Sequence, residues 1–288
     1  MRQRVITGIL FALGIAAFII PSLWYPIFTV AMAVIVGAVA VYELIKALRS
    51  GGFKPSCGLI VGGTLTALVI FILTWAFGLT VEASLALYLL IIGSYCLACG
   101  ILIPVVRPDD ESALRNGLIS GGIVFYVSFP LYCLCTGMAL IGNGWYYMLI
   151  GLCASWISDV FAYFSGVTLG KRKIVPHISP KKTWEGCIGG AVGCALAVMI
   201  YSVLVIKRVD SLNIKIVPFC AVTFFIGFLI SVMSQLGDWF ASVIKRRVGI
   251  KDYGNIFPGH GGMMDRFDSA FFTLPVGVLL ALIAINFF

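Results

Sequence analysis

The residues best suited to chemistry lie in one polar segment, residues 242–268, which separates two long apolar runs. Its basic residues are Lys245, Arg246, Arg247, Lys251 and Arg266, with His260 as a sixth cation when it is protonated. Its acids are Asp252, Asp265 and Asp268. So many charges beside apolar runs require a cause, and the candidates are a topology signal, a polar substrate, or both.

Three aspartates in and before this segment offer oxygen ligands for a metal ion. Asp265 and Asp268 are three residues apart, so we expect them to share a face at the start of the last helix. Asp238 stands at the end of the preceding apolar run. Capping of a helix N-terminus explains one acid well but two acids less well. Carboxylates without a cysteine nearby suit Mg²⁺, which often shares its coordination shell with substrate phosphates. The pattern therefore predicts an Mg²⁺ site made by Asp238, Asp265 and Asp268.

The glycine-rich stretch 258–262 favours phosphate binding. Gly261 and Gly262 carry no side chain, so their backbone N–H groups could approach phosphate oxygens closely. His260 lies beside them. We interpret it as a hydrogen-bond donor to phosphate rather than as a base.

Other polar residues stand within the apolar runs themselves. Asp159 lies inside one run, where a carboxylate is costly unless it is paired, hydrated or bound to a cation. A structural hydrogen bond to a neighbouring helix is the alternative interpretation for Asp159 and for Asp238. If the run that contains Asp238 continues as a helix, Ser234, Asp238, Ser242 and Lys245 form one stripe along it.

A second charged loop covers residues 170–186. Ser179, followed by a proline, is typical of a helix N-cap, which would place Lys181 and Lys182 in the first helical turn. Cations there oppose the helix dipole unless an anion binds at that end. The loop therefore predicts a phosphate site, although Lys171–Lys173 are equally well explained as a topology anchor.

The composition fixes the environment of these residues. Hydrophobic residues make up 61% of the chain and charged residues only 11%, against about 25% charged in soluble domains. Repeated apolar runs of roughly 20 residues then require lipid as the solvent. The nine cysteines are scattered through the runs without metal-ligand spacing, so we interpret them as packing residues.

The apolar runs predict an all-α, polytopic membrane protein with about nine spans. The expected spans are 5–21, 26–45, 57–77, 84–105, 117–140, 145–168, 186–206, 215–236 and 269–288. We expect no soluble domain. The chain divides into N-terminal transmembrane helices, 1–140, and a C-terminal catalytic region with both charged loops, 141–288.

The distribution of basic residues predicts the orientation. With a cytoplasmic N-terminus and nine spans, all of the 20 lysines and arginines except Lys207, Arg208 and Lys215 fall on the cytoplasmic side. This bias is the one expected of inner-membrane proteins. It places both charged loops, and hence the active site, on the side where nucleotides are found.

At these residues the sequence resembles the phosphatidate cytidylyltransferase family, also called CDP-diacylglycerol synthases. Every fixed position of the family signature is filled, by Ser242, Lys245-Arg246, Lys251-Asp252, Gly254, Phe257-Pro258, His260-Gly261-Gly262, Asp265-Arg266 and Asp268. The stretch Ser179–Gly186 and the pair Gly237-Asp238 also look like family motifs. These motifs cover roughly the C-terminal 45% of the chain, whereas the first 150 residues match only in hydropathy.

The resemblance implies a dimeric, multi-pass enzyme of the bacterial inner membrane that uses Mg²⁺. It implies the reaction of CTP with phosphatidate to CDP-diacylglycerol and pyrophosphate, with no nucleic-acid partner. In the family, aspartates at the positions of Asp238, Asp265 and Asp268 form the metal centre, and whether one or two ions bind stays open.

The remaining site residues fall into two groups. The predicted catalytic residues are Lys245, Lys251, Asp252, His260 and Arg266. The predicted substrate-binding residues are Ser179, Lys181, Lys182, Glu185, Asp159, Gly261 and Gly262.

Two alternatives stay open from the residues alone. One is a CTP-using enzyme with another lipid acceptor, such as a polyprenol. The other is an ion or solute transporter with Asp159 and Asp238 in its pathway. The spacing typical of CDP-alcohol phosphotransferases is not found in this sequence.

Overall fold

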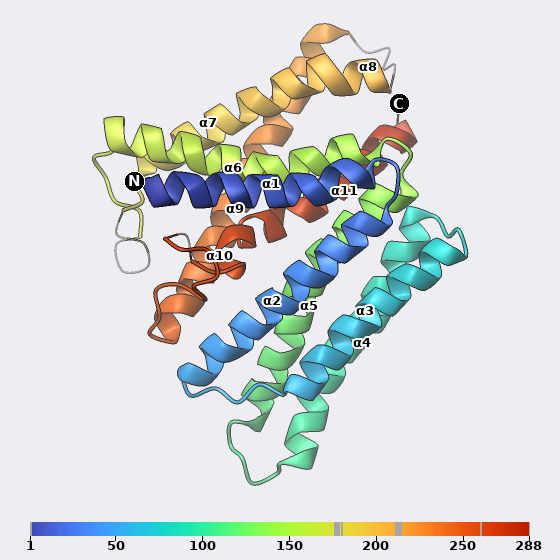
Figure 1. Ribbon diagram of the computed structural model, residues 1–288, viewed down its shortest axis with the longest axis vertical. Coiled ribbons are helices and arrows are strands. Elements are labelled where there is room, and N and C mark those ends of the chain that lie inside the picture. Colours follow the sequence, from blue (N-terminus) through green and yellow to red (C-terminus); the bar gives the residue numbers. More distant parts are fainter. Residues whose placement is uncertain (1, 176–178, 180, 211–214, 260, 288) are drawn as a thin grey trace. The chain divides into compact units, whose positions relative to one another are not determined.

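The computed structural model describes residues 2–175, 179, 181–210, 215–259 and 261–287 (Figure 1). The described residues form helices and turns and contain no β-strand. The all-α fold class predicted from the apolar runs is therefore confirmed.

The helices follow the predicted runs closely. They are α1 (Arg2–Ser22), α2 (Ile27–Ser50), α3 (Cys57–Ala76), α4 (Val81–Val106), α5 (Ala113–Leu140), α6 (Gly144–Leu169), α7 (Trp184–Tyr201), the π-helical turn η1 (Ser202–Ile206), α8 (Lys207–Val209), α9 (Ile216–Arg247), α10 (Met264–Phe267) and α11 (Ala270–Phe287). In the part of the chain that the structure describes, seven helical segments are long and apolar enough to cross a membrane. Within the described residues, Ile6–Ser22 and Ala270–Ala284 are apolar but shorter, so a count of nine spans is not confirmed.

The chain forms two compact units, residues 1–140 with 247–266 and residues 141–246 with 267–288. The first unit contains α1 to α5. Within it α4 packs against α5 and α3, and α2 packs against α5 and α1 (Figure 1). Buried hydroxyls tie these helices together, as in the 2.7 Å contact between Tyr88 Oη and Ser128 Oγ. Residues 247–266 belong to the first unit, although they follow α9 in the chain.

Residues 247–266 pack on α1 and α2 within the first unit. The Thr7 hydroxyl donates to the carbonyl of Pro258 at 3.2 Å, and the ring of Phe11 meets that of Phe257 edge to face at 5.3 Å. Gly51, at the end of α2, lies so close to Val248 that a Cβ there would clash. The signature segment is thus held by helices from the start of the chain.

The second unit is built on α6, which packs against α7 and α11 (Figure 1). Small residues allow the close approach of α6 and α7: a Cβ at Gly190 would lie 2.9 Å from the carbonyl oxygen of Ser158. On the other side, the Thr273 hydroxyl donates to the carbonyl of Gly151. The same unit contains α9, whose Gly237 packs on the backbone of Asp268.

Two predicted helix starts are wrong. α7 begins at Trp184, where Thr183 is the N-cap and its hydroxyl accepts from the N–H of Gly186 at 3.1 Å. Ser179 therefore does not cap the helix, and Lys181 and Lys182 precede it. The last helix begins at Ala270, so the two aspartates expected on its first turn lie in α10 (Asp265) and in the following turn (Asp268).

Candidate active site

The extension of α9 to Arg247 creates the polar stripe expected from the sequence. The helix ends shortly before Gly249, whose φ of 74° is the left-handed conformation that ends many helices. Ser234, Asp238, Ser242 and Lys245 therefore lie on one continuous helix. The Ser242 hydroxyl donates to Asp238 Oδ1 at 3.4 Å.

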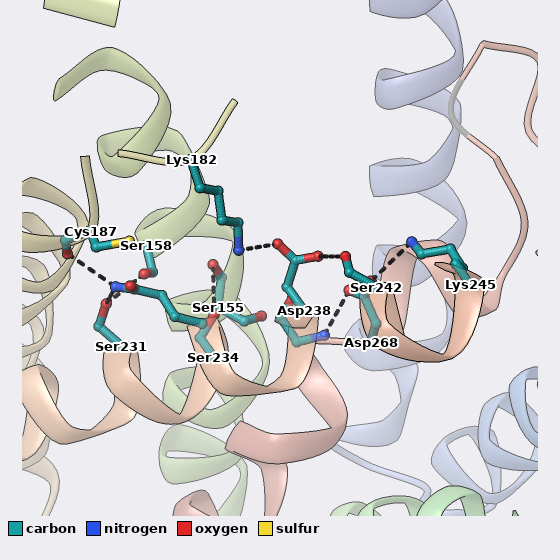
Figure 2. Close-up of polar contacts among 12 residues, drawn as sticks. Ser155, Ser158, Lys182, Cys187, Ser231, Ser234, Asp238, Ser242, Lys245 and Asp268 are labelled. Atoms are coloured by element: carbon teal, nitrogen blue, oxygen red, sulfur yellow. Dashed lines mark hydrogen bonds and ion pairs between the residues drawn. The ribbon is translucent and has the colours of Figure 1, made fainter. Parts of the chain in front are cut away.

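Lys182 reaches Asp238 from the loop before α7, and Figure 2 shows the two side chains directed at each other. The Lys182 ammonium pairs with Asp238 Oδ2 and also lies 5.6 Å from the ring centre of Trp239. Both side chains of the pair keep about a quarter of their surface exposed, 23% for Lys182 and 27% for Asp238. A charged ligand could therefore reach this ion pair and displace one of its two partners.

Lys245 and Asp268 form a second, more buried pair, with 4.0 Å between Lys245 Nζ and Asp268 Oδ2 (Figure 2). Burial raises the pKa of the Asp268 carboxyl, and the negative charges of Asp238 and Asp159 raise it further. The positive charge of Lys245 opposes that rise. Asp268 Oδ1 also accepts the N–H of Ser269 at 2.7 Å.

A row of buried serine hydroxyls lies along α6 and α9 beside these pairs (Figure 2). This hydroxyl seam, formed by Ser155, Ser158, Ser231 and Ser234, was not predicted from the sequence. Ser158 Oγ and Ser231 Oγ are 2.5 Å apart, and Gln235 Nε2 donates to Ser231 Oγ at 3.2 Å. Ser234 Oγ approaches the Ser155 carbonyl at 3.5 Å. The available signal was spacing, since each helix has two serines three residues apart on one face.

Glu185 holds the charged loop at residues 170–186 in place. Its Oε2 accepts the N–H of Lys171 at 3.0 Å and that of Arg172 at 3.3 Å, and the N–H of Trp184 donates to the Arg172 carbonyl at 2.9 Å. These bonds fold residues 171–174 back along 182–184. Lys182 enters the Asp238 pair from this folded loop, whereas Lys181 is exposed.

Asp265 is used differently from Asp238 and Asp268. In the first unit its Oδ2 accepts the N–H of Tyr253 at 2.8 Å and the N–H of Gly262 at 2.9 Å. Gly261, with φ of 83°, provides the left-handed turn that brings the loop back, and its carbonyl accepts from Phe257 N–H at 3.0 Å. Asp265 therefore links Tyr253, which precedes the glycine-rich stretch 258–262, to Gly262 at the end of that stretch.

Comparisons with known proteins agree with this arrangement. A family model described as "Cytidylyltransferase family" matches residues 2–284. The chain belongs to the cytidylyltransferase family. Similar proteins named "Phosphatidate cytidylyltransferase" include one from Bacillus subtilis, 32% identical over 288 residues that cover 96% of this chain and 95% of that protein. Another, from Mycobacterium bovis, is 31% identical over 93% of this chain and 84% of its own length. One from Thermotoga maritima is 38% identical over 46% of this chain and 47% of its own.

The structure of this cytidylyltransferase groups only some of the residues predicted to form the site. Lys182, Asp238, Lys245 and Asp268 meet in the second unit, and the charge of Asp159 reaches Asp268. In the first unit Lys251 and Asp252 are exposed, Arg266 is half-buried in α10, and Gly262 donates its N–H to Asp265. Ser179 donates its N–H to the Val175 carbonyl at 2.9 Å. His260 lies outside the described residues.

The predicted metal site stays a prediction. Among the residues that the structure describes, no three acidic, histidine or cysteine side chains are grouped closely enough to hold a metal ion. All nine cysteines are thiols and all are buried or half-buried, as expected of packing residues.

Proposed function

We propose that this cytidylyltransferase transfers CMP from CTP to phosphatidate, giving CDP-diacylglycerol and pyrophosphate. The relatives from Bacillus subtilis and Mycobacterium bovis carry the name of this activity and match over most of both chains. The observation that carries the proposal is the pair of lysine–aspartate contacts, Lys182 with Asp238 and Lys245 with Asp268, in a unit built of apolar helices.

These contacts suit a reaction between two polyanions. Lysines held next to carboxylates are compensated in the free enzyme, so they carry no uncompensated buried charge. When a phosphate arrives, the ammonium groups of Lys182 and Lys245 can turn from their aspartates toward it. Stabilisation of negative charge by such placed cations is the main catalytic task in phosphoryl-group chemistry.

The proposed reaction needs no strong general base. An ionised phosphate oxygen of phosphatidate attacks the α-phosphorus of CTP, and a new P–O–P link forms. The bond between the α-phosphorus and the oxygen that bridges to the β-phosphorus breaks, and pyrophosphate leaves with that electron pair. The protein's task is then to neutralise charge and align the two phosphates.

The donor set of the second unit fits Mg²⁺. Asp238 and Asp268 are hard oxygen donors whose charges interact, and Mg²⁺ is usually held by one or two carboxylates together with substrate phosphates. We propose that Asp238 and Asp268 hold it, with Asp265 as the third ligand expected from the sequence. When bound, Mg²⁺ would neutralise charge on the triphosphate and on the leaving pyrophosphate.

Other predicted residues enter as part of the proposal. Lys251 and Arg266 would carry phosphate charge, and His260 would donate a hydrogen bond to phosphate. Lys181, Glu185 and Asp252 keep their predicted roles in substrate binding or catalysis only as proposals, because none of them lies in the lysine–aspartate pairs.

The same proposal covers the setting of the enzyme. The multiple apolar helices make it a membrane protein. The excess of basic residues in the loops at residues 46–54, 107–115, 171–182 and 245–266 supports a cytoplasmic active site in a bacterial inner membrane. A homodimer is proposed from the family resemblance alone.

The decisive experiment is turnover of radiolabelled CTP by the purified protein in detergent, with and without phosphatidate and with and without Mg²⁺. The proposal expects labelled CDP-diacylglycerol and pyrophosphate only when both are present. Product formed with a polyprenyl phosphate but not with phosphatidate would show that the lipid acceptor is a polyprenyl phosphate. Solute flux in liposomes that needs no CTP, with no lipid product, would favour the transporter alternative.

A further inference from the structure

Glu43 is a buried acid in α2 that no motif singles out. The residue is 2% exposed, in the C-terminal half of a helix that is long enough to span a membrane, and Lys46 and Arg49 follow it on the same helix. An acid at such a place is costly and needs specific partners. Its two carboxylate oxygens find them in the backbone of the signature segment: Oε1 accepts the N–H of Met263 at 3.1 Å, and Oε2 accepts the N–H of Met264 at 2.8 Å.

The glycine-rich loop is shaped to receive this carboxylate. Gly254 and Gly262 both lie against Glu43, and a Cβ at either position would collide with its carboxylate oxygens. The absence of side chains at these two positions therefore has a local physical reason. It makes room for an acid that comes from a helix more than 200 residues earlier in the chain.

Glu43 completes a pattern that Asp265 begins. Asp265 accepts the N–H groups of Tyr253 and Gly262, and Glu43 accepts the next two, those of Met263 and Met264. Two carboxylates thus satisfy the backbone of this turn. Hydrogen bonds to a charged acceptor are stronger than neutral ones, so the turn is fixed directly before Asp265 and Arg266.

We propose that Glu43 is a positioning residue for cytidylyl transfer: it holds the 262–264 turn and thereby fixes the signature residues Asp265 and Arg266. This inference rests on the proposed function for the identity of the reaction. It gives the N-terminal helices a role in the chemistry. The sequence resemblance was limited to hydropathy over the first 150 residues, but the family model covers these helices as well. Glu43 itself does not touch the reacting atoms in this scheme.

The chemistry of the contact selects the test. Glu43→Gln keeps the size of the side chain but presents an NH₂ group to one of the two backbone N–H donors. A purely space-filling residue would tolerate that change, whereas a double acceptor would not. Glu111→Gln is the matched control, because Glu111 is an exposed acid of the same unit and takes no part in the turn.

The first readout is hydrogen exchange of the peptide that covers residues 261–267, in the full-length protein in detergent. Glu43→Gln should exchange faster there than wild type and Glu111→Gln, with the other helices unchanged, because exchange reports local opening. This readout does not depend on any reaction. Exchange equal to wild type in a folded Glu43→Gln protein would overturn the inference.

The second readout is steady-state turnover of CTP and phosphatidate. Because misplacement of a catalytic group lowers the rate steeply, kcat of Glu43→Gln should fall by at least about tenfold, with KM for CTP changed by less than about threefold. Faster exchange with wild-type kcat would make Glu43 merely structural and would sink the positioning role. No turnover by wild type would instead reject the proposed function, and the exchange result would still stand.

A second variant covers the case in which Glu43→Gln does not fold. Gly254→Ala leaves the carboxylate in place but inserts a methyl group where its oxygens lie. It should produce the same faster exchange at 261–267 and the same loss of kcat. Wild-type exchange and wild-type kcat in Gly254→Ala would overturn the inference.

Discussion

Glu43 and Asp265 in the first unit accept hydrogen bonds from backbone N–H groups, whereas Asp238 and Asp268 in the second unit pair with lysine side chains. Backbone donors are fixed by the fold, so the first pair of acids holds a loop in place. Lysine donors can turn toward another anion, so the second pair can give up its partners when a substrate arrives. The comparison separates acids that build the site from acids that are available to ligands.

The largest effect is expected in the second unit, from Asp238→Asn. The change removes one of the proposed Mg²⁺ donors and leaves Lys182 without its counter-charge, so kcat/KM should fall by at least about 100-fold. Asp109→Asn, at an exposed site in the first unit, is the control and should stay near wild type. Turnover of Asp238→Asn close to the control would remove Asp238 from the site.

Asp265→Asn tests the same comparison in the first unit. An amide oxygen can still accept the N–H groups of Tyr253 and Gly262, so hydrogen exchange of the loop should change little. If Asp265 is also a metal ligand, turnover should nevertheless fall steeply, by up to about 100-fold, because the charge is lost. Wild-type turnover at saturating Mg²⁺ would leave Asp265 as a residue that only shapes the loop.

The helices could be predicted from the sequence because lipid requires long apolar runs, and those runs are visible without any tertiary information. The stripe from Ser234 to Lys245 was predictable for the same reason, since helical spacing alone defines it. The start of α7 was not, because Ser179 and Thr183 are both good N-caps and only the fold of the 171–174 loop decides between them.

The site was predictable only where charges cluster in the sequence. Asp238 and Asp268 stand in or beside the charged segment, but their pairing with Lys182 and Lys245 depends on packing among α6, α7 and α9. Glu43 was missed, although an acid inside a predicted span is itself a signal, as it was for Asp159. Its partners could not be predicted, because they are backbone N–H groups, which leave no mark in the sequence.

Lys181 and Lys182 form a matched pair that sharpens the assignment of the second unit. The sequence predicts the same phosphate-binding role for both lysines. In the structure Lys182 contacts Asp238, whereas Lys181 is exposed. Lys182→Gln should lower kcat/KM by at least about tenfold, or 1.4 kcal/mol of transition-state binding. Lys181→Gln should lower it less than Lys182→Gln does, because Lys181 is exposed and lies outside the Asp238 pair. Equal losses in both variants would show that the loop binds substrate without the Asp238 contact being decisive.

The smallest effect is expected in the hydroxyl seam, which belongs to the second unit but not to its charged pairs. Ser158→Ala removes the 2.5 Å contact with Ser231, while Gln235 still donates to Ser231. Hydrogen bonds between membrane helices contribute about 0.6 kcal/mol on average, so the loss should be of that size. In a chain of this length it corresponds to a decrease in Tm of about 1–2 °C.

Thr168→Ala, on the same helix, is the control, because Thr168 is exposed and its hydroxyl donates to the Phe164 carbonyl of its own helix. Turnover of Ser158→Ala should stay within about twofold of wild type, since Ser158 bonds to Ser231 and lies outside the lysine–aspartate pairs. A large loss of kcat at unchanged Tm would instead extend the active site from the charged pairs into the serines.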